Sequence, residues 1–187
     1  MDTITVQKRD LSLKPKQLRR TGLVPGSVFG GTLQDSISIQ IPESTARKLI
    51  RQKREGSKLQ LSLDDQIIPV QIKEKTYNTL NNEIVQISFQ ALKSNQKVNS
   101  VIHIVLKNTD KATGLLERML LEIPYASLPA DMIDTITVDL ENIPVGSIVT
   151  VGDIPELNNE KIELQVDTES IVLRVNDKKR ATDRSAE

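Results

Sequence analysis

Hydrophobic and polar residues alternate with a period of two along much of this chain. In its first half, apolar residues occupy every second position of four runs, at 37–41, 59–63, 68–72 and 85–89. Such alternation places the apolar side chains on one face of a half-buried strand. Asp64-Asp65-Gln66 separates the second and third runs and predicts a hairpin turn. We therefore interpret the two neighbouring carboxylates as turn formers rather than as an acid–base pair.

Two segments of the first half have the pattern of helices. Residues 15–20 begin with a proline, which suits the first turn of a helix, and a glycine follows at position 22. Residues 43–55 end at Gly56 and carry a mainly apolar stripe. The stripe consists of Ala46, Leu49, Ile50 and Lys53. Residues 24–31 predict a strand interrupted by proline and glycine. We expect this half to form a mostly antiparallel β-barrel with about two helices.

A polar stretch at 93–97 separates these elements from a second set of strands. The expected strands cover 101–106, 136–140, 147–151, 162–166 and 170–175. Residues 115–123 fit a helix as well as a strand, and we favour a strand. Turns are expected at Pro129, at 144–146 and at 158–159. The chain as a whole is thus predicted to be mainly β, with a barrel domain over 1–93, an all-β domain over 94–176 and a disordered tail over 177–187.

Charge divides the chain at the same place. Residues 1–93 carry 15 Lys and Arg against 9 Asp and Glu, a balance of +6, whereas 94–187 carry 10 against 16, a balance of −6. A basic domain joined to an acidic one predicts a polyanion as the partner of the first. One basic cluster lies near the N-terminus, and a second consists of Arg47, Lys48, Arg51, Lys53, Arg54 and Lys58. The second cluster fits either a solvated helix surface or part of a shared RNA surface.

Composition narrows the classes of function further. Aromatic residues make up 2% of the chain, too few for a platform on which successive bases stack, so structured RNA is favoured over single strands. The absence of cysteine excludes disulfides, thiolate catalysis and thiolate-bound zinc. No signal peptide and no stretch of about 20 apolar residues is found, so we expect no membrane partner and a soluble, cytoplasmic protein.

Catalytic patterns are also missing from the sequence. The single histidine, His103, lies in an alternating strand and is interpreted as structural rather than as a metal ligand. Gly30-Gly31 is not followed by the Gly-Lys-Ser/Thr of a phosphate-binding loop. We therefore expect no enzyme activity, no catalytic residues, no metal, no cofactor and no small-molecule substrate.

Two stretches resemble a known family. Residues 16–30, KQLRRTGLVPGSVFG, are similar to the opening motif of a bacterial large-subunit ribosomal protein family called L-twenty-five. The second stretch resembles the C-terminal domain of the longer members, known as CTC or general stress proteins. It comprises LPAD at 128–131, ITVDL at 136–140, GSI at 146–148 and VGDI at 151–154. The resemblance covers residues 1–175 in order.

The resemblance implies a barrel that binds 5S rRNA at an irregular internal loop in the central protuberance of the large subunit. It implies 5S rRNA and large-subunit proteins as partners, a ribosome-associated location in the cytoplasm, and no enzyme activity. Arginine and lysine near the start of the chain are expected to contact phosphates. The candidate RNA-binding residues are Arg9, Lys14, Lys16, Arg19, Arg20, Phe29, Tyr77, Gln86 and Ser88.

The chain departs from the family pattern where the base contacts are expected. Lys16-Gln17 replaces a pair of arginines, Leu23 replaces a lysine and Phe29 replaces a tyrosine. Residues 76–79 and 86–89 replace a Gln-Arg-His-Pro run and a His-x-Asp-Phe run. Two hypotheses stay open: a 5S rRNA-binding protein with altered base contacts, or a stress-type relative with weakened or lost RNA binding that acts through protein contacts. Removal of residues 94–187 is expected to leave RNA affinity unchanged or raised, because the second domain is acidic.

Overall fold

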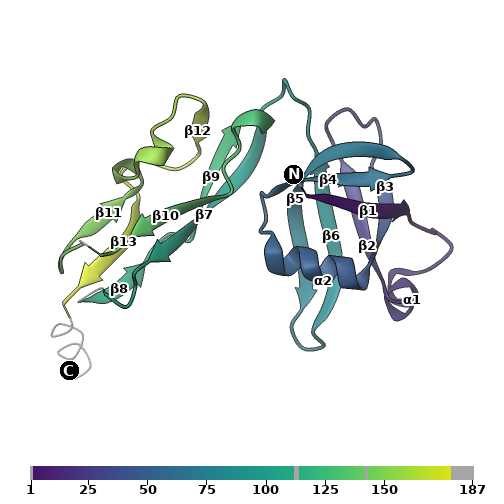
Figure 1. Cartoon of the computed structure of the whole chain (residues 1–187), viewed down its shortest axis with the longest axis horizontal. Coiled ribbons are helices and arrows are strands. Elements are labelled where there is room, and N and C mark those ends of the chain that lie inside the picture. Colours follow the sequence, from purple (N-terminus) through teal and green to yellow (C-terminus); the bar gives the residue numbers. More distant parts are fainter. Residues whose placement is uncertain (1, 112–113, 142, 178–187) are drawn as a thin grey trace. The chain divides into compact units, whose positions relative to one another are not determined.

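A computed structural model describes residues 2–111, 114–141 and 143–177, and these form two compact units (Figure 1). The first unit comprises Met1–Ser100 with Leu128–Asp134, and the second comprises Val101–Ser127 with Thr135–Glu187. Residues 94–100 and 128–134 thus group with the first unit, whereas the sequence prediction placed them in the second domain. The disordered tail predicted for 177–187 lies, apart from Asp177, outside the described residues.

The first unit is a closed six-stranded barrel with the strand order β1-β3-β2-β6-β5-β4, which confirms the predicted barrel. Its strands are β1 (Thr3–Lys8), β2 (Leu23–Phe29), β3 (Ile37–Pro42), β4 (Lys58–Leu63), β5 (Gln66–Asn78) and β6 (Glu83–Ala91). Four of the pairings are antiparallel, but β1 pairs with β4 and β2 with β6 in parallel. The pairing of β1 with β4 closes the ring. β1 is not among the strands predicted from the sequence, although Ile4 and Val6 alternate with polar residues.

The barrel core is built from the alternating positions that the sequence indicates. Buried aliphatic residues from all six strands, together with Phe89, form one cluster. Asp64 and Asp65 have positive φ angles of 47° and 65°, the conformation of a tight hairpin turn, which confirms the predicted turn. One predicted position is wrong. A register shift between β5 and β6 turns Ile84 into the core and leaves Val85 half-buried outside it.

The two helices are α1 (Pro15–Arg20) and α2 (Glu43–Gln52). Ala46 and Leu49 of α2 are buried against the barrel. The helix ends three residues earlier than the predicted limit at 55, because Lys53 adopts an extended backbone with φ −122° and ψ 144°. Lys53 is held there by an ion pair of its Nζ with Asp2 (2.8 Å), and its carbonyl accepts a hydrogen bond from Lys75 Nζ (2.9 Å).

The second unit is β-rich, as expected. One sheet has the order β10-β7-β9-β12 and the other the order β11-β13-β8. The strands are β7 (Val98–Lys107), β8 (Leu115–Arg118), β9 (Glu122–Ser127), β10 (Thr135–Asp139), β11 (Ile148–Thr150), β12 (Ile162–Leu164) and β13 (Ile171–Asn176). Short 3₁₀ helices cover Pro129–Asp131, Val151–Asp153 and Pro155–Leu157.

The ambiguous segment 115–123 is extended, as favoured, but it contributes to two strands in different sheets. The favoured strand would alternate Leu115, Met119, Leu121 and Ile123 as apolar positions, and the observed burial does not follow this pattern. Ile123 is fully buried, whereas the other three side chains are 50–60% exposed. The chain leaves one sheet after Arg118 and enters the other at Glu122, so no single strand face spans the segment.

Candidate nucleic-acid interface

Three serines on adjacent barrel strands form a continuous row on the outside of the first unit. Ser38 of β3 is paired with Ser27 of β2, and Ser27 is paired with Ser88 of β6. The Ser27 and Ser88 hydroxyl oxygens lie 3.4 Å apart. We call Ser38, Ser27 and Ser88 the serine row. Their side chains point outward because the neighbouring positions, Val28 and Ile39 among them, are fully buried in the core.

Amide and aromatic side chains extend this surface along β6 and β2. Gln86 Nε2 donates a hydrogen bond to Ser88 Oγ (3.2 Å). Phe29 is paired with Gln90, two residues further along the same β2–β6 pair. We call the serine row together with Gln86, Gln90 and Phe29 the polar face. Every polar side chain in it carries a hydroxyl or an amide, and each of these groups can both donate and accept hydrogen bonds.

The row ends on an arginine at one side and a glutamate at the other. The Arg9 backbone N–H donates to Ser38 O (3.0 Å), while Glu74 of β5 is paired with Ser88. The Arg9 guanidinium donates through Nη2 to the carbonyl of Leu13 (3.0 Å), which fixes the loop that leads into α1. Arg9 is therefore half-buried and helps to shape the loop beside the row.

The loop before α1 is also shaped by an acidic residue. Asp10 Oδ1 accepts hydrogen bonds from the Ser12 hydroxyl (2.6 Å) and the Ser12 N–H (2.9 Å). These bonds, the hydroxyl first, lower the pKa of Asp10, so the carboxylate stays ionised while it holds the turn. Lys14 N donates to Gln17 Oε1 (3.2 Å) at the start of α1, which pins the first turn of the helix.

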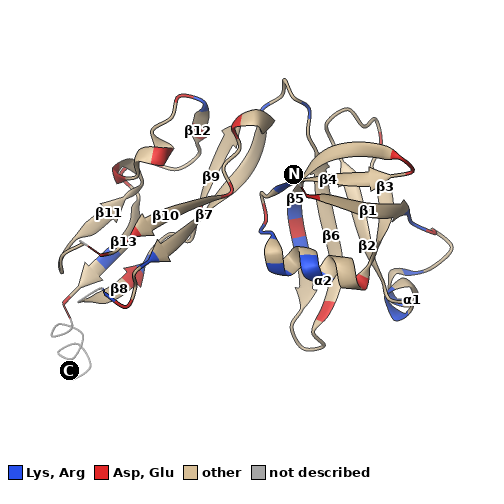
Figure 2. Cartoon of the chain, in the orientation of Figure 1, with Lys and Arg blue, Asp and Glu red and all other residues tan. Residues whose placement is uncertain are grey.

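Three cations project from this region into solvent. Lys14, Lys16 and Arg20 are exposed, and within the described part of the chain no carboxylate lies at ion-pair distance from any of them. Figure 2 shows the basic residues of α1 beside the loop that follows β1. We call Lys14, Lys16 and Arg20 the α1 cations. Their charges are free to meet an anionic partner.

Arg19 differs from its neighbours, although it lies in the same basic segment. Its Nε is 2.6 Å from Glu83 Oε1, its Nη1 is 3.5 Å from the carbonyl of Val85, and its side chain is only 16% exposed. The guanidinium therefore fastens α1 to the start of β6. Arg19 is thus engaged in an ion pair within the first unit, unlike the α1 cations.

Tyr77 is likewise separated from the other candidates. It is 39% exposed and is paired with Ile84, whose side chain is buried. The pKa of Arg47 on α2 is raised, first by its hydrogen bond with Glu43 and to a lesser extent by Tyr77. Tyr77 thus lies on the α2 side of the β5–β6 hairpin, away from Gln86 and Ser88.

The structure brings most of the predicted residues together. Phe29, Gln86 and Ser88 share the polar face, with Arg9 at its edge and the α1 cations near the loop that precedes β2. Sequence reasoning missed Ser27 and Ser38. The signal was present, because Ser38 alternates with Ile37 and Ile39, but the register that aligns three serines across strands is not visible in one sequence.

The described residues contain neither a metal-binding cluster nor a helix that could span a membrane. Within residues 2–111, 114–141 and 143–177, no group of three or more histidine, aspartate or glutamate side chains is placed to hold a metal ion. In the same ranges, no helix has the length and apolar character needed to cross a membrane.

Family models place the chain in the class of ribosomal proteins. The model of the Ribosomal L25p family matches residues 4–89, and the model described as Ribosomal protein TL5, C-terminal domain, matches residues 97–179. Together the two matches cover the barrel and most of the acidic half.

Individual relatives extend over both matched regions. "Large ribosomal subunit protein bL25" of Chloroherpeton thalassium is 31% identical over 159 residues, which span 83% of this chain and 79% of the relative. The proteins of the same name from Gloeothece citriformis and Listeria monocytogenes are 28% and 24% identical, over 81% and 92% of this chain and 80% and 84% of their own lengths. The chain belongs to the Ribosomal L25p family, in its long, two-domain form. This is a structural, non-enzymatic family, in agreement with the prediction from sequence.

Proposed function

We propose that this protein is a structural component of the large ribosomal subunit, associated with the ribosome in the cytoplasm, and that its barrel binds 5S rRNA through the polar face. Family membership supports the structural ribosomal role. The finer assignment, 5S rRNA in the central protuberance, rests on the resemblance of the opening motif and on one observation: the serine row of Ser38, Ser27 and Ser88. The row gives the barrel an uncharged, hydrogen-bonding strip across three neighbouring strands.

The row fits the minor groove of RNA. That groove is wide and shallow in A-form helices and displays 2′-hydroxyls and base edges. Small serine side chains let the backbone of β2 and β6 approach such a surface closely, while the hydroxyls and the Gln86 amide exchange hydrogen bonds with it. Long or charged side chains at these positions would hold the RNA away.

The α1 cations supply the electrostatic part of binding. Lys14, Lys16 and Arg20 are exposed next to the loop that Asp10 and Arg9 hold in place. Contacts of this kind with phosphates release counterions and make affinity fall steeply with salt. They position the RNA but carry little sequence information. Readout of the internal loop therefore falls to the polar face.

The test is binding of the full chain to a 5S rRNA internal-loop fragment across a salt series. Ser27→Glu places a negative charge in the middle of the row and is expected to weaken binding by about tenfold or more, because it repels phosphates and fills the strip. The matched control is Ser62→Glu, a half-buried serine of β4, since β4 lies opposite β2 in the ring. The control is expected to bind like the parent protein.

Two outcomes would count against the proposal. Equal affinities for the fragment and for an unrelated RNA would mean that the barrel no longer recognises 5S rRNA, as in the alternative of a stress-type relative acting through protein contacts. Equal losses in Ser27→Glu and Ser62→Glu would move the interface off the serine row. Thermal unfolding of both variants checks that each retains its fold.

A further inference from the structure

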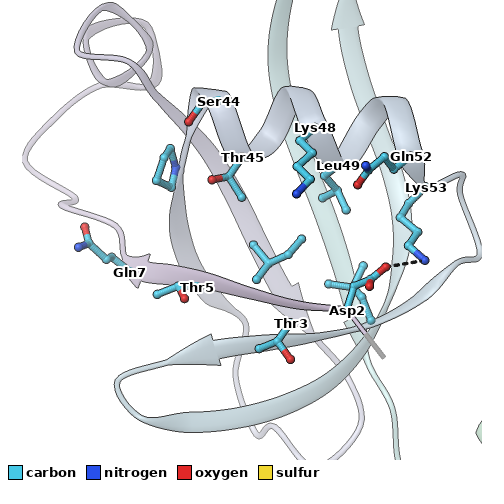
Figure 3. A pocket seen from close by; sticks show the side chains of 13 residues that line it. Asp2, Thr3, Thr5, Gln7, Ser44, Thr45, Lys48, Leu49, Gln52 and Lys53 are labelled. Atoms are coloured by element: carbon cyan, nitrogen blue, oxygen red, sulfur yellow. Dashed lines mark ion pairs between the residues drawn. The ribbon is translucent and has the colours of Figure 1, made fainter.

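A groove runs between α2 and β1 on the first unit. It is a partly open cavity of about 620 Å³, bordered by Thr45, Lys48, Gln52 and Lys53 on the helix side and by Asp2 and Gln7 on the strand side. Figure 3 shows Lys48 and Lys53 extending from the helix side toward β1. We propose that this groove and the adjoining surface of α2 bind the sugar–phosphate backbone of a second RNA segment, different from the one at the polar face.

The position of the groove in the ring separates it from the polar face. In the strand order β1-β3-β2-β6-β5-β4, three steps lead from β1 to β6 in either direction, so the two strands lie on opposite sides of the barrel. Gln86 and Ser88 belong to β6 and Ser27 to the adjoining β2, whereas the groove lies along β1. Ser38, on β3, is the one residue of the serine row on a strand next to β1 in the ring. A rigid duplex seated on β6 therefore leaves the groove open to another RNA.

The surface beside the groove carries an excess of positive charge. Lys48, Arg51 and Arg54 are exposed, and among the described residues none of them has a carboxylate at ion-pair distance. We call these three residues the α2 cations. Figure 2 shows basic residues along α2. Lys48 and Arg51 are three residues apart on the helix and are therefore neighbours on one side of it.

The nearby carboxylates do not cancel this charge. Glu43 Oε1 is 2.6 Å from Arg47 Nη2, and Asp2 Oδ2 is 2.8 Å from Lys53 Nζ. The hydrogen bond from Lys53 is the largest cause of a lowered pKa at Asp2, so this carboxylate remains ionised and balances Lys53. Glu43 and Asp2 thus each neutralise one cation, and Glu55 Oε1 accepts a hydrogen bond from the Lys75 N–H (2.9 Å). The three α2 cations are left without a carboxylate at ion-pair distance among the described residues.

A polyanion with regularly spaced charges suits this arrangement. Lys48 lines the groove together with the hydroxyl and amide groups of Thr45, Gln52 and Gln7. Arg51 lies on the adjoining surface of α2, and Arg54 just past the end of the helix. Phosphates contact cations and neutral hydrogen-bond donors together in RNA complexes. Because the chain belongs to a family of ribosomal proteins, RNA is the polyanion that surrounds it. This inference goes beyond the proposed function, because it gives the barrel a second RNA contact and hence a bridging role.

The experiment uses the full chain tethered through its C-terminus. A labelled RNA duplex of unrelated sequence is the probe, applied at low salt with and without a saturating unlabelled 5S rRNA fragment. The α2 variant is Lys48→Gln/Arg51→Gln/Arg54→Gln, and the matched control is Lys93→Gln/Lys107→Gln/Arg118→Gln, which lies outside both proposed RNA surfaces. Both remove three positive charges from exposed positions, so the net charge and the number of altered side chains are the same.

In the presence of the 5S rRNA fragment, the parent protein and the matched control are expected to bind the duplex equally. The α2 variant is expected to bind it at least about tenfold more weakly, with a salt slope lower by roughly 2–3, because up to three phosphate contacts are lost. In the absence of the fragment, the α2 variant still loses this component. The loss of duplex binding in the α2 variant can therefore be measured even if the protein does not recognise 5S rRNA.

Three results would overturn the inference. The α2 variant binding the duplex like the parent protein would show that these cations stay solvated. Full competition between the 5S rRNA fragment and the duplex would mean a single RNA surface. Displacement of the duplex by polyglutamate at matched charge concentration would mean that the groove accepts an acidic protein rather than RNA.

Discussion

Arg19 and Arg20 are adjacent in the sequence, yet the fold gives them different roles. Arg19 is 16% exposed and is paired with Glu83 at 2.6 Å, whereas Arg20 is exposed and has no carboxylate within ion-pair distance among the described residues. Consecutive side chains of a helix point about 100° apart around its axis, which is enough to direct one at β6 and the other at solvent. Only one of the two arginines is available to an RNA phosphate.

We predict that substitution of Arg19 affects mainly stability, whereas substitution of Arg20 affects mainly RNA binding. Arg19→Ala should lower the free energy of unfolding by roughly 1–2 kcal/mol, since it leaves Glu83 unpaired and loosens α1. Arg20→Ala should change stability little and weaken RNA binding several-fold. Urea unfolding and RNA titration of each variant measure the two effects. Glu83→Gln serves as the control, because it should reproduce the instability of Arg19→Ala without touching a cation.

The sequence predicts which side chains point outward from the strands, but it does not predict the partners that these side chains meet in the fold. Phe29, Gln86 and Ser88 are outward positions of alternating strands, and their placement follows from a period of two. The pairing of Arg19 with Glu83 joins residues 64 positions apart, and no local pattern announces it. The family motif at 16–30, together with its charge, therefore made Arg19 a candidate.

At the scale of elements, the barrel depends on a close approach between β2 and β6. Gly26 has no side chain, and a Cβ built there would lie 2.9 Å from the Ile87 carbonyl oxygen and 3.1 Å from Ile39 Cγ1. Its φ angle is not in the left-handed region, so the requirement is for space rather than for backbone freedom. The parallel β2–β6 pairing passes through this point.

We predict that Gly26→Ala destabilises the first unit by roughly 1–3 kcal/mol, because the added methyl group pushes β2 and β6 apart. Hydrogen exchange of the barrel amides under native conditions measures this loss. A second substitution, Ile39→Val, should recover little of it, since it removes only Ile39 Cδ1 at 3.4 Å and leaves both Ile39 Cγ1 at 3.1 Å and the backbone oxygen of Ile87 at 2.9 Å. Full recovery would mean that side-chain crowding alone excludes alanine.

The sequence predicted strands correctly where apolar and polar residues alternate over a long run. It did not predict features that depend on which strands pair with each other. The runs at 37–41 and 59–63 became β3 and β4, but the two parallel pairings that close the ring left no mark in the pattern. The register shift at Val85 and the early end of α2 at Gln52 also depend on contacts with distant residues. Tertiary contacts overrode local periodicity at these points.

At the scale of the whole molecule, the first unit does not end where its last barrel strand ends. Val98 is buried, the Ser100 hydroxyl donates to the carbonyl of Gly56 (3.4 Å), and Gln71 Nε2 donates to the carbonyl of Asn99 (3.1 Å). Lys58 Nζ donates to the carbonyl of Pro129 (2.6 Å). The barrel therefore depends on residues that lie beyond the polar stretch at 93–97.

A fragment of residues 1–93 should consequently be less stable than the barrel in the full chain, by roughly 2–4 kcal/mol from the lost burial and hydrogen bonds. A fragment of residues 1–100 should recover part of the difference. Urea unfolding followed by barrel-core amide exchange compares the three proteins. Identical stability of the two fragments would show that residues 94–100 add nothing to the barrel.

The parallel pairings of the ring also have a consequence for the order of events during synthesis. Gly26 is paired with Ile87, and Thr3 with Gln60, so both pairings join parts of the chain that are made far apart in time. The β2–β3 hairpin can form early, but β2 lacks its second neighbour until β6 has left the exit tunnel. Until then the nascent chain exposes an unpaired strand edge, which is prone to aggregation and needs protection by chaperones. Ring closure, and with it the complete serine row, comes only after nearly the whole first unit has been translated.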